Sequence, residues 1–410
     1  MHGTPMGMEQ PSSVPRNRNV FFVGLLSFFG GVSQDIFAPV LPIYLTTILG
    51  FDKTFVGIAE GIVTASANIA KVVSGFIADK FKKQKPLIFV GYLFSMVSRP
   101  LLAAVSAAAP VFALRFMDGV GKGVKDPPKD VLIAGSAEKT TRGRSFGVAR
   151  MLDTLGSVVG PLLLAALLYL LQGSATLYHT ILVLSAIPLI VTLTVLVTKV
   201  REAPREEPRS VGAAAVSDRK LPTSFYLFLA VVIVFTLGNS SDAFLVLRAK
   251  NLGFTLVEIP IAIALSNLVY ALGAVPFGSL SDRIGRIPTL LIGWFAYAAV
   301  YLGFALASQP GWVWLLYAAY GVYYATSEGV ARAFLADIVG AGHRGRAFGI
   351  YGTAVGLATL PASFFAGLLW DRFGPPAPFY FGAAMATVAV ILLVLLFRSR
   401  RAGGPAAAGV

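Results

Sequence analysis

The chain of 410 residues contains no cysteine and only three histidines. The absence of cysteine excludes disulfide bonds, thiolate metal sites, iron–sulfur clusters and catalytic thiols. His2, His179 and His343 are too far apart in sequence for the helical histidine pair of a metalloprotease. The sequence also has no phosphate-binding loop in a strand context and no catalytic triad. We therefore expect no metal, no cofactor and no enzymatic activity.

Charged residues are scarce as well. They make up 13% of the chain, against about 25% in an average soluble protein, while 56% of the residues are hydrophobic. A mean hydropathy of +0.74 means that the apolar side chains cannot all lie in one core, so most must face lipid or other helices within lipid. These values exclude an ordinary soluble enzyme and predict an all-α, multi-pass membrane protein.

Apolar runs of about 20 residues predict twelve transmembrane helices in two sets of six. The first set is expected near residues 19–45, 54–79, 86–107, 110–135, 144–171 and 176–198. The second set is expected near residues 222–247, 256–281, 287–308, 312–338, 346–370 and 378–398. Each set forms a six-helix bundle, so the predicted units are tail, bundle, linker, bundle and tail: residues 1–18, 19–198, 199–221, 222–398 and 399–410.

The formal net charge of +14 is a signal of membrane topology rather than of nucleic-acid binding. If both termini lie inside, 22 lysines and arginines fall on inside segments and four fall on outside segments. This positive-inside bias predicts a plasma (inner) membrane protein with both termini in the cytoplasm and with membrane lipid, not nucleic acid, around it.

An internal repeat divides the chain in the same place. Gly50-Phe51 recurs as Gly253-Phe254, and the pattern Gly-x-x-x-Asp-basic of residues 75–80 recurs at residues 278–283, both at an offset of 203. Two like-oriented repeats predict a cleft between the halves and a mechanism of alternating access.

The repeated loop carries a family resemblance. Residues 75–83 resemble the loop between helices 2 and 3 of the major facilitator superfamily, with Phe81 where a glycine is usual, and the second copy keeps that glycine as Gly285. The resemblance covers residues 19–398 and implies a secondary transporter of two pseudo-symmetric six-helix bundles. It implies gating roles for the charged residues of both loops, although these could be topology anchors alone: Asp79, Lys80, Asp282, Arg283 and Arg286.

A proton-coupling site is expected in the first half. Residues 114–119 resemble the family's buried-arginine motif, and residues 35–42 are similar to the acidic, two-proline first helix of drug–proton antiporters. An intramembrane arginine needs a carboxylate or a water-filled cavity. We expect Asp35 to be the partner of Arg115 and, with Asp118, to carry protons, because a carboxyl in a low dielectric holds its proton more readily. A static Arg–Asp pair is the alternative.

The fifth predicted helix resembles the family's antiporter motif, which marks many exporters. Its glycines and the following proline imply a gating role for Gly156, Gly160 and Pro161. The alternative is the small-residue packing that every membrane bundle uses.

Three lysines and three aspartates fall within 13 residues of one predicted span, at positions 118, 122, 125, 126, 129 and 130. Their i,i+4 spacing predicts pairs of Lys122 with Asp118 and with Asp126. Pro127 and Pro128 are expected to kink or unwind the end of this helix.

Within the spans of the first half, seven basic residues face five aspartates if Glu60 and Asp79 are set aside as helix-end residues. This surplus favours a positively biased cavity for an anionic or zwitterionic substrate, with a self-neutralised gate as the equal alternative. The expected substrate-binding residues are Lys122, Asp126, Arg150, Asp153, Asn267, Tyr324 and Glu328. The expected gating residues of the charged helix are Lys125, Lys129 and Asp130. Asp242 is expected to be solvated near an outer helix end.

These observations predict a monomeric secondary active transporter whose partners are a small-molecule substrate and protons. Proton-coupled export of a small organic compound is the first hypothesis, and proton-coupled uptake of an organic anion is the second. A channel or an integral-membrane enzyme would leave the 203-residue repeat unexplained.

Overall fold

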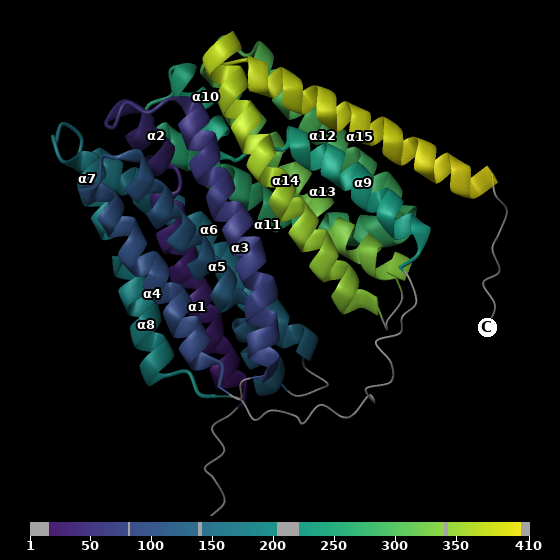
Figure 1. The fold of residues 1–410 in the computed structure, drawn as a ribbon, viewed down its shortest axis with the longest axis horizontal. Helices are drawn as coiled ribbons and strands as arrows, with labels where there is room; N and C mark the ends of the chain where they lie inside the picture. The colour runs from purple at the N-terminus through teal and green to yellow at the C-terminus, as the bar shows by residue number, and fades with distance from the viewer. Residues whose placement is uncertain (1–15, 81–82, 138–141, 203–220, 340–342, 403–410) are drawn as a thin grey trace, which may run out of the picture.

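The computed structural model describes residues 16–80, 83–137, 142–202, 221–339 and 343–402, and this part of the chain is helical without a strand. Most of the predicted linker lies outside it, as do the side chains of Asp79 and Lys80. Fifteen α-helices and one 3-10 turn fill the twelve predicted spans within these residues (Figure 1).

In the first half, six spans are built from eight α-helices and the 3-10 turn η1. Their bounds are α1 Arg16–Phe37, α2 Val40–Thr47, α3 Lys53–Lys80, α4 Lys85–Leu101, η1 Leu102–Ala104, α5 Ala108–Ser136, α6 Arg142–Leu170, α7 Leu177–Leu184 and α8 Ile187–Thr198.

In the second half, six spans are built from seven α-helices. Their bounds are α9 Thr223–Gly238, α10 Ala243–Asn251, α11 Glu258–Ile284, α12 Arg286–Leu306, α13 Gly311–Val339, α14 Arg344–Phe373 and α15 Ala377–Ala402.

Three of the predicted spans each consist of two successive helices. The first span stops at Phe37 and resumes at Val40, after Pro39, whose ring removes a backbone donor. The sixth stops at Leu184 and resumes at Ile187, with a proline in the first turn of the new helix. The seventh is interrupted over residues 239–242.

The double proline of α5 has the opposite outcome. Helix α5 runs unbroken through Pro127 and Pro128 to Ser136, so the predicted unwinding does not occur. Pro128 cannot donate to the carbonyl of Val124, but the Ser74 hydroxyl of α3 donates to that carbonyl over 2.6 Å. The neighbouring helix therefore satisfies the acceptor that the proline leaves free.

By length and composition alone, nine of the described spans are long and apolar enough to cross a membrane. The three others are α4, α5 and α13. Helix α4 has 17 residues, α5 carries the charged run described above, and α13 is rich in tyrosine. Helices α5 and α13 can still span the membrane because their polar side chains face protein and a cavity instead of lipid.

The two halves meet most closely along α3 and α14 (Figure 1). We use the term linker face for the end of the bundle where α8 ends and α9 begins, and far face for the end where α2 ends and α3 begins. Near the far face, a Cβ atom on Gly57 would collide with the Ser363 carbonyl, and one on Gly61 would lie 2.9 Å from the Leu360 Cα. Only glycine permits this approach of the two backbones.

Polar contacts hold the far face closed. The Asp371 carboxylate at the end of α14 accepts hydrogen bonds from the backbone N–H of Thr54 at 2.7 Å and of Lys53 at 3.2 Å. Lys250 of α10 donates to the Thr47 hydroxyl of α2 over 2.7 Å. Each bond joins one half to the other at the start or end of a helix.

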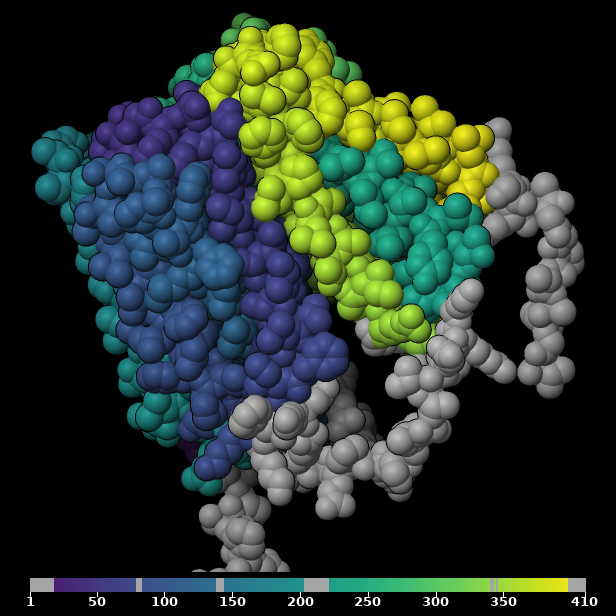
Figure 2. Space-filling view, viewed as in Figure 1, coloured from purple at the N-terminus to yellow at the C-terminus, as the bar shows by residue number. Residues whose placement is uncertain are grey.

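Toward the linker face, α3 and α14 separate. Figure 2 shows them in contact near the top of the view and diverging below. A Cβ atom on Gly75 would meet no described atom within 4 Å, and Phe76 is 74% exposed. The bundle is therefore closed at the far face and spread at the linker face.

We predict that Gly57→Val opens the far face. Overpacking a close contact costs about 1–3 kcal/mol, and about 1.4 kcal/mol already changes a two-state ratio tenfold. Because the chain contains no cysteine, spin labels can be placed by Ala175→Cys and Gln309→Cys on far-face loops of opposite halves. Electron–electron distance measurements between the two labels should show a population with longer distances than in the labelled parent.

The matched control is Gly75→Val on the same helix, where the added side chain meets open space. It should leave the far-face distances unchanged. Identical distance distributions for both variants and the parent would show that the glycine contacts do not set the conformation.

Candidate functional site

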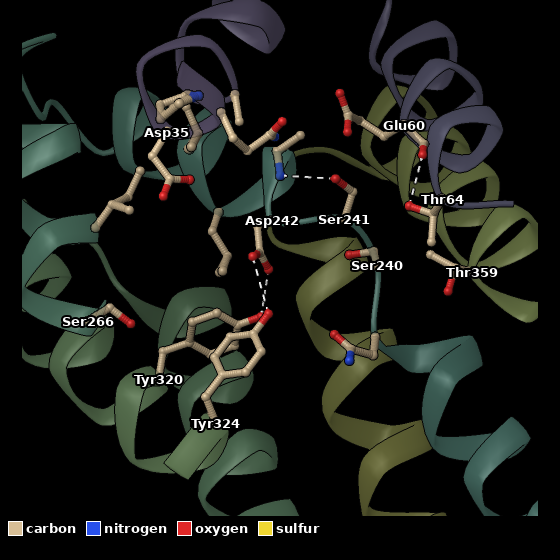
Figure 3. A pocket seen from close by; sticks show the side chains of 18 of the residues that line it. Asp35, Glu60, Thr64, Ser240, Ser241, Asp242, Ser266, Tyr320, Tyr324 and Thr359 are labelled. Carbon is tan, nitrogen blue, oxygen red and sulfur yellow. Dashed lines mark hydrogen bonds between the residues drawn. The ribbon is translucent and has the colours of Figure 1, made fainter. Parts of the chain in front are cut away.

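A cavity of about 440 Å³ lies between the two halves. It is lined by α1, α3 and α5 of the first half and by α9, α10, α11, α13 and α14 of the second, together with the break between α9 and α10 (Figure 3). Its charged lining residues among the described part of the chain are Asp35, Glu60, Lys122 and Asp242. A solute in this cavity would contact both halves at once.

Asp35 of α1 lies at the cavity beside α6. A Cβ atom on Gly160 would be 2.9 Å from the Asp35 Cβ, and one on Gly156 would collide with the Phe28 carbonyl. The Asp35 side chain lies beside Ser157 of α6. Gly156 and Gly160 therefore bring α6 into backbone contact with α1, the helix of Asp35. Pro161, which follows them, is buried within α6.

Arg115 does not pair with Asp35, and that prediction is wrong. Its guanidinium contacts the Glu60 carboxylate at 2.7 Å and the Asp118 carboxylate at 3.4 Å. The expectation that Glu60 is a helix-end residue is also wrong, because it lies two turns inside α3. Its side chain is 18% exposed and lines the cavity. A carboxylate inside an apolar run was the signal that sequence reasoning set aside.

Asp118 is the centre of a buried ion cluster. Its carboxylate lies 3.3 Å from Arg99 Nε, 3.4 Å from Arg115 and 3.2 Å from Lys122 Nζ, and its side chain is fully buried. Arg99 of α4, to which the sequence assigned no role, also donates to the Ser33 hydroxyl and to the Gln34 side chain of α1. The cluster thus connects α1, α3, α4 and α5.

The cluster contains three cations and two carboxylates, so it carries one surplus positive charge. Arg99 and Arg115 are 1% and 2% exposed, whereas Lys122 is 22% exposed and lines the cavity. The surplus charge is therefore presented to the cavity at Lys122. The predicted pair of Lys122 with Asp118 is confirmed.

The predicted pair of Lys122 with Asp126 is wrong. Asp126 contacts Lys71 of α3 at 3.1 Å and Lys129 at 3.5 Å, because its side of α5 faces α3 away from the cavity. Lys125 lies over the Tyr92 ring at 4.7 Å, a cation–π contact. Lys129 donates to the Ser27 hydroxyl, and Asp130 is exposed. These four residues are not among those that line the cavity.

In the second half, Asp242 lines the cavity at the break between α9 and α10. Its carboxylate accepts hydrogen bonds from Tyr320 at 2.7 Å and Tyr324 at 3.3 Å, and both hydroxyl groups point toward it in Figure 3. The sequence placed this residue near the outer end of a continuous helix and missed its position. The polar run 239–242 inside an apolar span was the available signal.

The side chains that line the cavity do not have the expected excess of positive charge. Three carboxyl groups and one ammonium group face it among the described residues. The count of charges over whole spans failed because Arg99 and Arg115 point into the bundle, and Lys71 and Arg150 lie outside the lining.

Arg150 forms a bridge between the halves on the linker side of the cavity. Its guanidinium lies 3.4 Å from the Glu328 carboxylate of α13 and donates to Tyr270 of α11 over 3.1 Å. Asp153, 3.4 Å from Arg150, and Arg332, 3.2 Å from Glu328, complete the group. Tyr270 and Glu328 lie about one turn nearer the linker face than Asn267 and Tyr324, the cavity-lining residues of the same two helices.

Of the other predicted residues, Asn267 and Tyr324 line the cavity, and Asn267 donates to the Ser157 carbonyl of the first half over 2.6 Å. In the second copy of the loop motif, Arg286 pairs with Asp282 at 2.6 Å and with Asp337 of α13 at 3.3 Å, while Arg283 is exposed. The first copy, at Asp79 and Lys80, lies outside the described side chains.

The fold and the cavity agree with the comparisons with known proteins. The family model of the Major Facilitator Superfamily matches residues 23–247 and 227–409. The chain belongs to this superfamily of membrane transporters. It is an integral, multi-pass membrane protein and a secondary transporter, as the sequence predicted.

Two relatives and two solved structures illustrate the similarity. An uncharacterised MFS-type transporter of Methanocaldococcus jannaschii is 33% identical over 386 residues, 93% of this chain and 95% of that protein. The multidrug resistance protein MdtH of Salmonella paratyphi B is 26% identical over 151 residues, 37% of each chain. A nucleoside transporter, NupG, has a TM-score of 0.73 at 14% identity, over 93% of this chain and 99% of its own. A bacterial homologue of the human lysosomal transporter Spinster, in an inward-facing and unoccupied conformation, has a TM-score of 0.73 at 15% identity, over 94% and 96%.

We predict that Asp118→Asn destabilises the protein strongly. The change leaves three buried cations with one carboxylate, and removing one partner of a buried ion pair costs about 3–5 kcal/mol. Thermal unfolding of the purified protein should show a markedly lower midpoint.

Asp282→Asn is the control, because Asp282 is 64% exposed and its partner Arg286 keeps a second contact with Asp337. An exposed pair contributes less than about 1 kcal/mol, so the midpoint should hardly change. Equal midpoints for the two variants would contradict a structural role for the cluster.

Proposed function

We propose that this transporter exports a small organic compound in exchange for protons, with Asp35 as the proton carrier. The linker face is cytoplasmic in this proposal, because the basic residues are concentrated there. The conformation with a spread linker face is then inward-facing. The protein works as a monomer in the plasma membrane with both termini in the cytoplasm.

The observation that carries the proposal is the position of Asp35. It is a carboxyl group at the cavity, and no ion pair among the described residues includes it. Nearby, the buried cluster has one surplus positive charge that reaches the cavity at Lys122. A carboxyl group in such a place can gain and lose a proton without breaking an ion pair.

The charge of the cavity links substrate and proton. When Asp35 is ionised, the cavity is more negative and attracts a cationic group. When Asp35 is protonated, the same cationic group is held less strongly. A positively charged compound and a proton therefore exclude one another, and this is the requirement for antiport.

A negatively charged substrate would fit the alternative function, which is proton-coupled uptake of an organic anion. An anionic group near Lys122 would balance the surplus positive charge and favour protonation of Asp35, so anion and proton would travel together. Lys122 at the cavity favours this alternative. The three carboxyl groups of the lining, the α6 contact with Asp35, and the partial similarity to a multidrug resistance protein support antiport instead.

We predict that Asp35→Asn folds but loses proton coupling. A compound that stabilises the parent in a thermal panel of metabolites and drugs should, when added to energised everted vesicles, collapse the pH gradient with the parent and not with the variant. Exchange of labelled for unlabelled compound should persist, because it needs no net proton movement. Full proton-coupled transport by a folded variant would exclude Asp35 as the carrier.

We predict that Arg150→Gln loosens the linker side of the cavity. The bridge from Arg150 to Glu328 joins the halves, and it is exposed, so its loss should cost roughly 0.4–1 kcal/mol. This corresponds to about a two- to fivefold rise in the rate at which a maleimide labels a cavity cysteine introduced by Thr359→Cys.

Arg332→Gln is the matched control. Arg332 pairs with the same Glu328, but from one turn along the same helix, so it joins nothing across the halves. If both variants accelerate labelling equally, the effect comes from freeing Glu328 and not from breaking the bridge.

A further inference from the structure

The break between α9 and α10 leaves Asp242 in an unusual position for its residue type. Asp242 is the residue immediately before α10, where an aspartate side chain normally caps the first backbone N–H groups. Here its side chain makes no capping hydrogen bond, and Leu245 and Val246 donate to its backbone carbonyl instead. The carboxylate is turned into the cavity.

The carboxylate of Asp242 is oriented by its neighbours and not neutralised by them. Tyr320 and Tyr324 each donate one hydrogen bond, at 2.7 and 3.3 Å, and no cation among the described residues forms an ion pair with it. Two neutral donors orient the carboxylate without supplying a counter-charge. A negative charge at a cavity wall lacks a partner until an occupant supplies one.

The surroundings of Asp242 add further acceptors. Helix α9 ends at Gly238 and α10 begins at Ala243, so the negative end of one helix dipole and the positive end of the next both meet the break. Asn239 lines the cavity and uses its amide N–H₂ to donate to Tyr323, which leaves its side-chain oxygen available as an acceptor. Tyr317 also lines the cavity, and its buried hydroxyl has no hydrogen-bond partner among the described residues.

This arrangement suits a cation that has N–H groups. The phenol oxygens, and not the ring faces, lie against Asp242 (Figure 3), so the site offers acceptors for hydrogen bonds. A quaternary ammonium group has no N–H and would need aromatic faces for its binding. A primary or secondary ammonium group can bond to the carboxylate and to the neighbouring oxygens together.

We propose that Asp242, held by Tyr320 and Tyr324, binds the protonated amine of the transported compound. The substrate is then an organic amine, with its ammonium group at the second half and the rest of the molecule in the cavity toward Asp35 and Lys122. The inference rests on the proposed transport function and names the class of its substrate. It assigns substrate recognition to one half and proton carriage to the other.

The test uses four small probes of one shape on the purified full chain in lipid nanodiscs at pH 7. They are the 2-phenylethylammonium ion, its N,N,N-trimethyl derivative, neutral 2-phenylethanol and the anion 3-phenylpropanoate. Isothermal titration calorimetry, with concentrations up to about 10 mM, measures each affinity. We expect the primary ammonium ion to bind at least about tenfold more tightly than each of the other three, since a hydrogen bond to a charged group has about that effect.

The same titrations on Asp242→Asn should abolish the preference for the ammonium ion. The matched control is Glu258→Gln, a carboxylate of the same half that bonds to Thr255 at the far face and is not among the cavity-lining residues. It should keep the full preference. Tyr324→Phe, which removes the longer of the two phenol hydrogen bonds, should reduce the preference without eliminating it.

Three results would overturn the inference. They are a preference that survives in Asp242→Asn, an affinity for the anion or the neutral alcohol equal to that for the ammonium ion, and equal binding of the trimethyl derivative. Loss of the preference in Asp35→Asn, with retention in Asp242→Asn, would move the amine to the first half and leave proton antiport intact. Because these titrations use no proton gradient, a failure of proton coupling in vesicles leaves the amine site standing.

Discussion

One surplus positive charge, buried among four helices, is the constraint on which the rest of the site depends. Asp118 is shared by Arg99, Arg115 and Lys122, and Glu60 supplies the second carboxylate. Isolated, each of these charges would be costly within a membrane; together they neutralise one another except for one unit. That unit reaches the cavity at Lys122, so the ionisation of any other cavity group is coupled to it. Asp35 is such a group, and its protonation changes the net charge that a solute meets.

The second constraint is geometric. Glycines on α3 and α6 allow backbone contacts of two kinds: Gly57 and Gly61 join the halves near the far face, while Gly156 and Gly160 hold α6 against α1 within the first half. The first kind can separate as the halves rock, because its partners belong to different bundles. The second kind lies within one bundle, so we expect it to keep Asp35 beside Ser157 during such a motion. In the proposed mechanism, proton carriage by Asp35 then stays on the first bundle while access to it changes.

Much of the fold could be predicted from the sequence, because hydropathy, charge bias and an internal repeat all depend on local patterns. The positions of the spans came from apolar runs, the like-oriented halves from the repeat, and the pair of Lys122 with Asp118 from its i,i+4 spacing. The partner of Arg115 could not be found in this way, since Glu60 and Asp35 are both carboxylates in apolar helices and only packing selects between them. The break at residues 239–242 was missed because this run of four polar residues lies inside the predicted span 222–247, which apolar content alone defines. The helix does not unwind at Pro127 and Pro128, and the sequence could not show this because the hydroxyl that compensates for Pro128 belongs to another helix.

The central claim is that a cationic compound and a proton exclude one another in this cavity. Proton linkage of binding tests it most directly: titrating the 2-phenylethylammonium ion into the protein at one pH, in buffers of different ionisation enthalpy, gives the number of protons exchanged on binding. Under conditions where Asp35 is protonated before binding, the account predicts the release of about one proton per bound ion at most, and none with Asp35→Asn. Proton uptake on binding, or release that persists unchanged in Asp35→Asn, would contradict it.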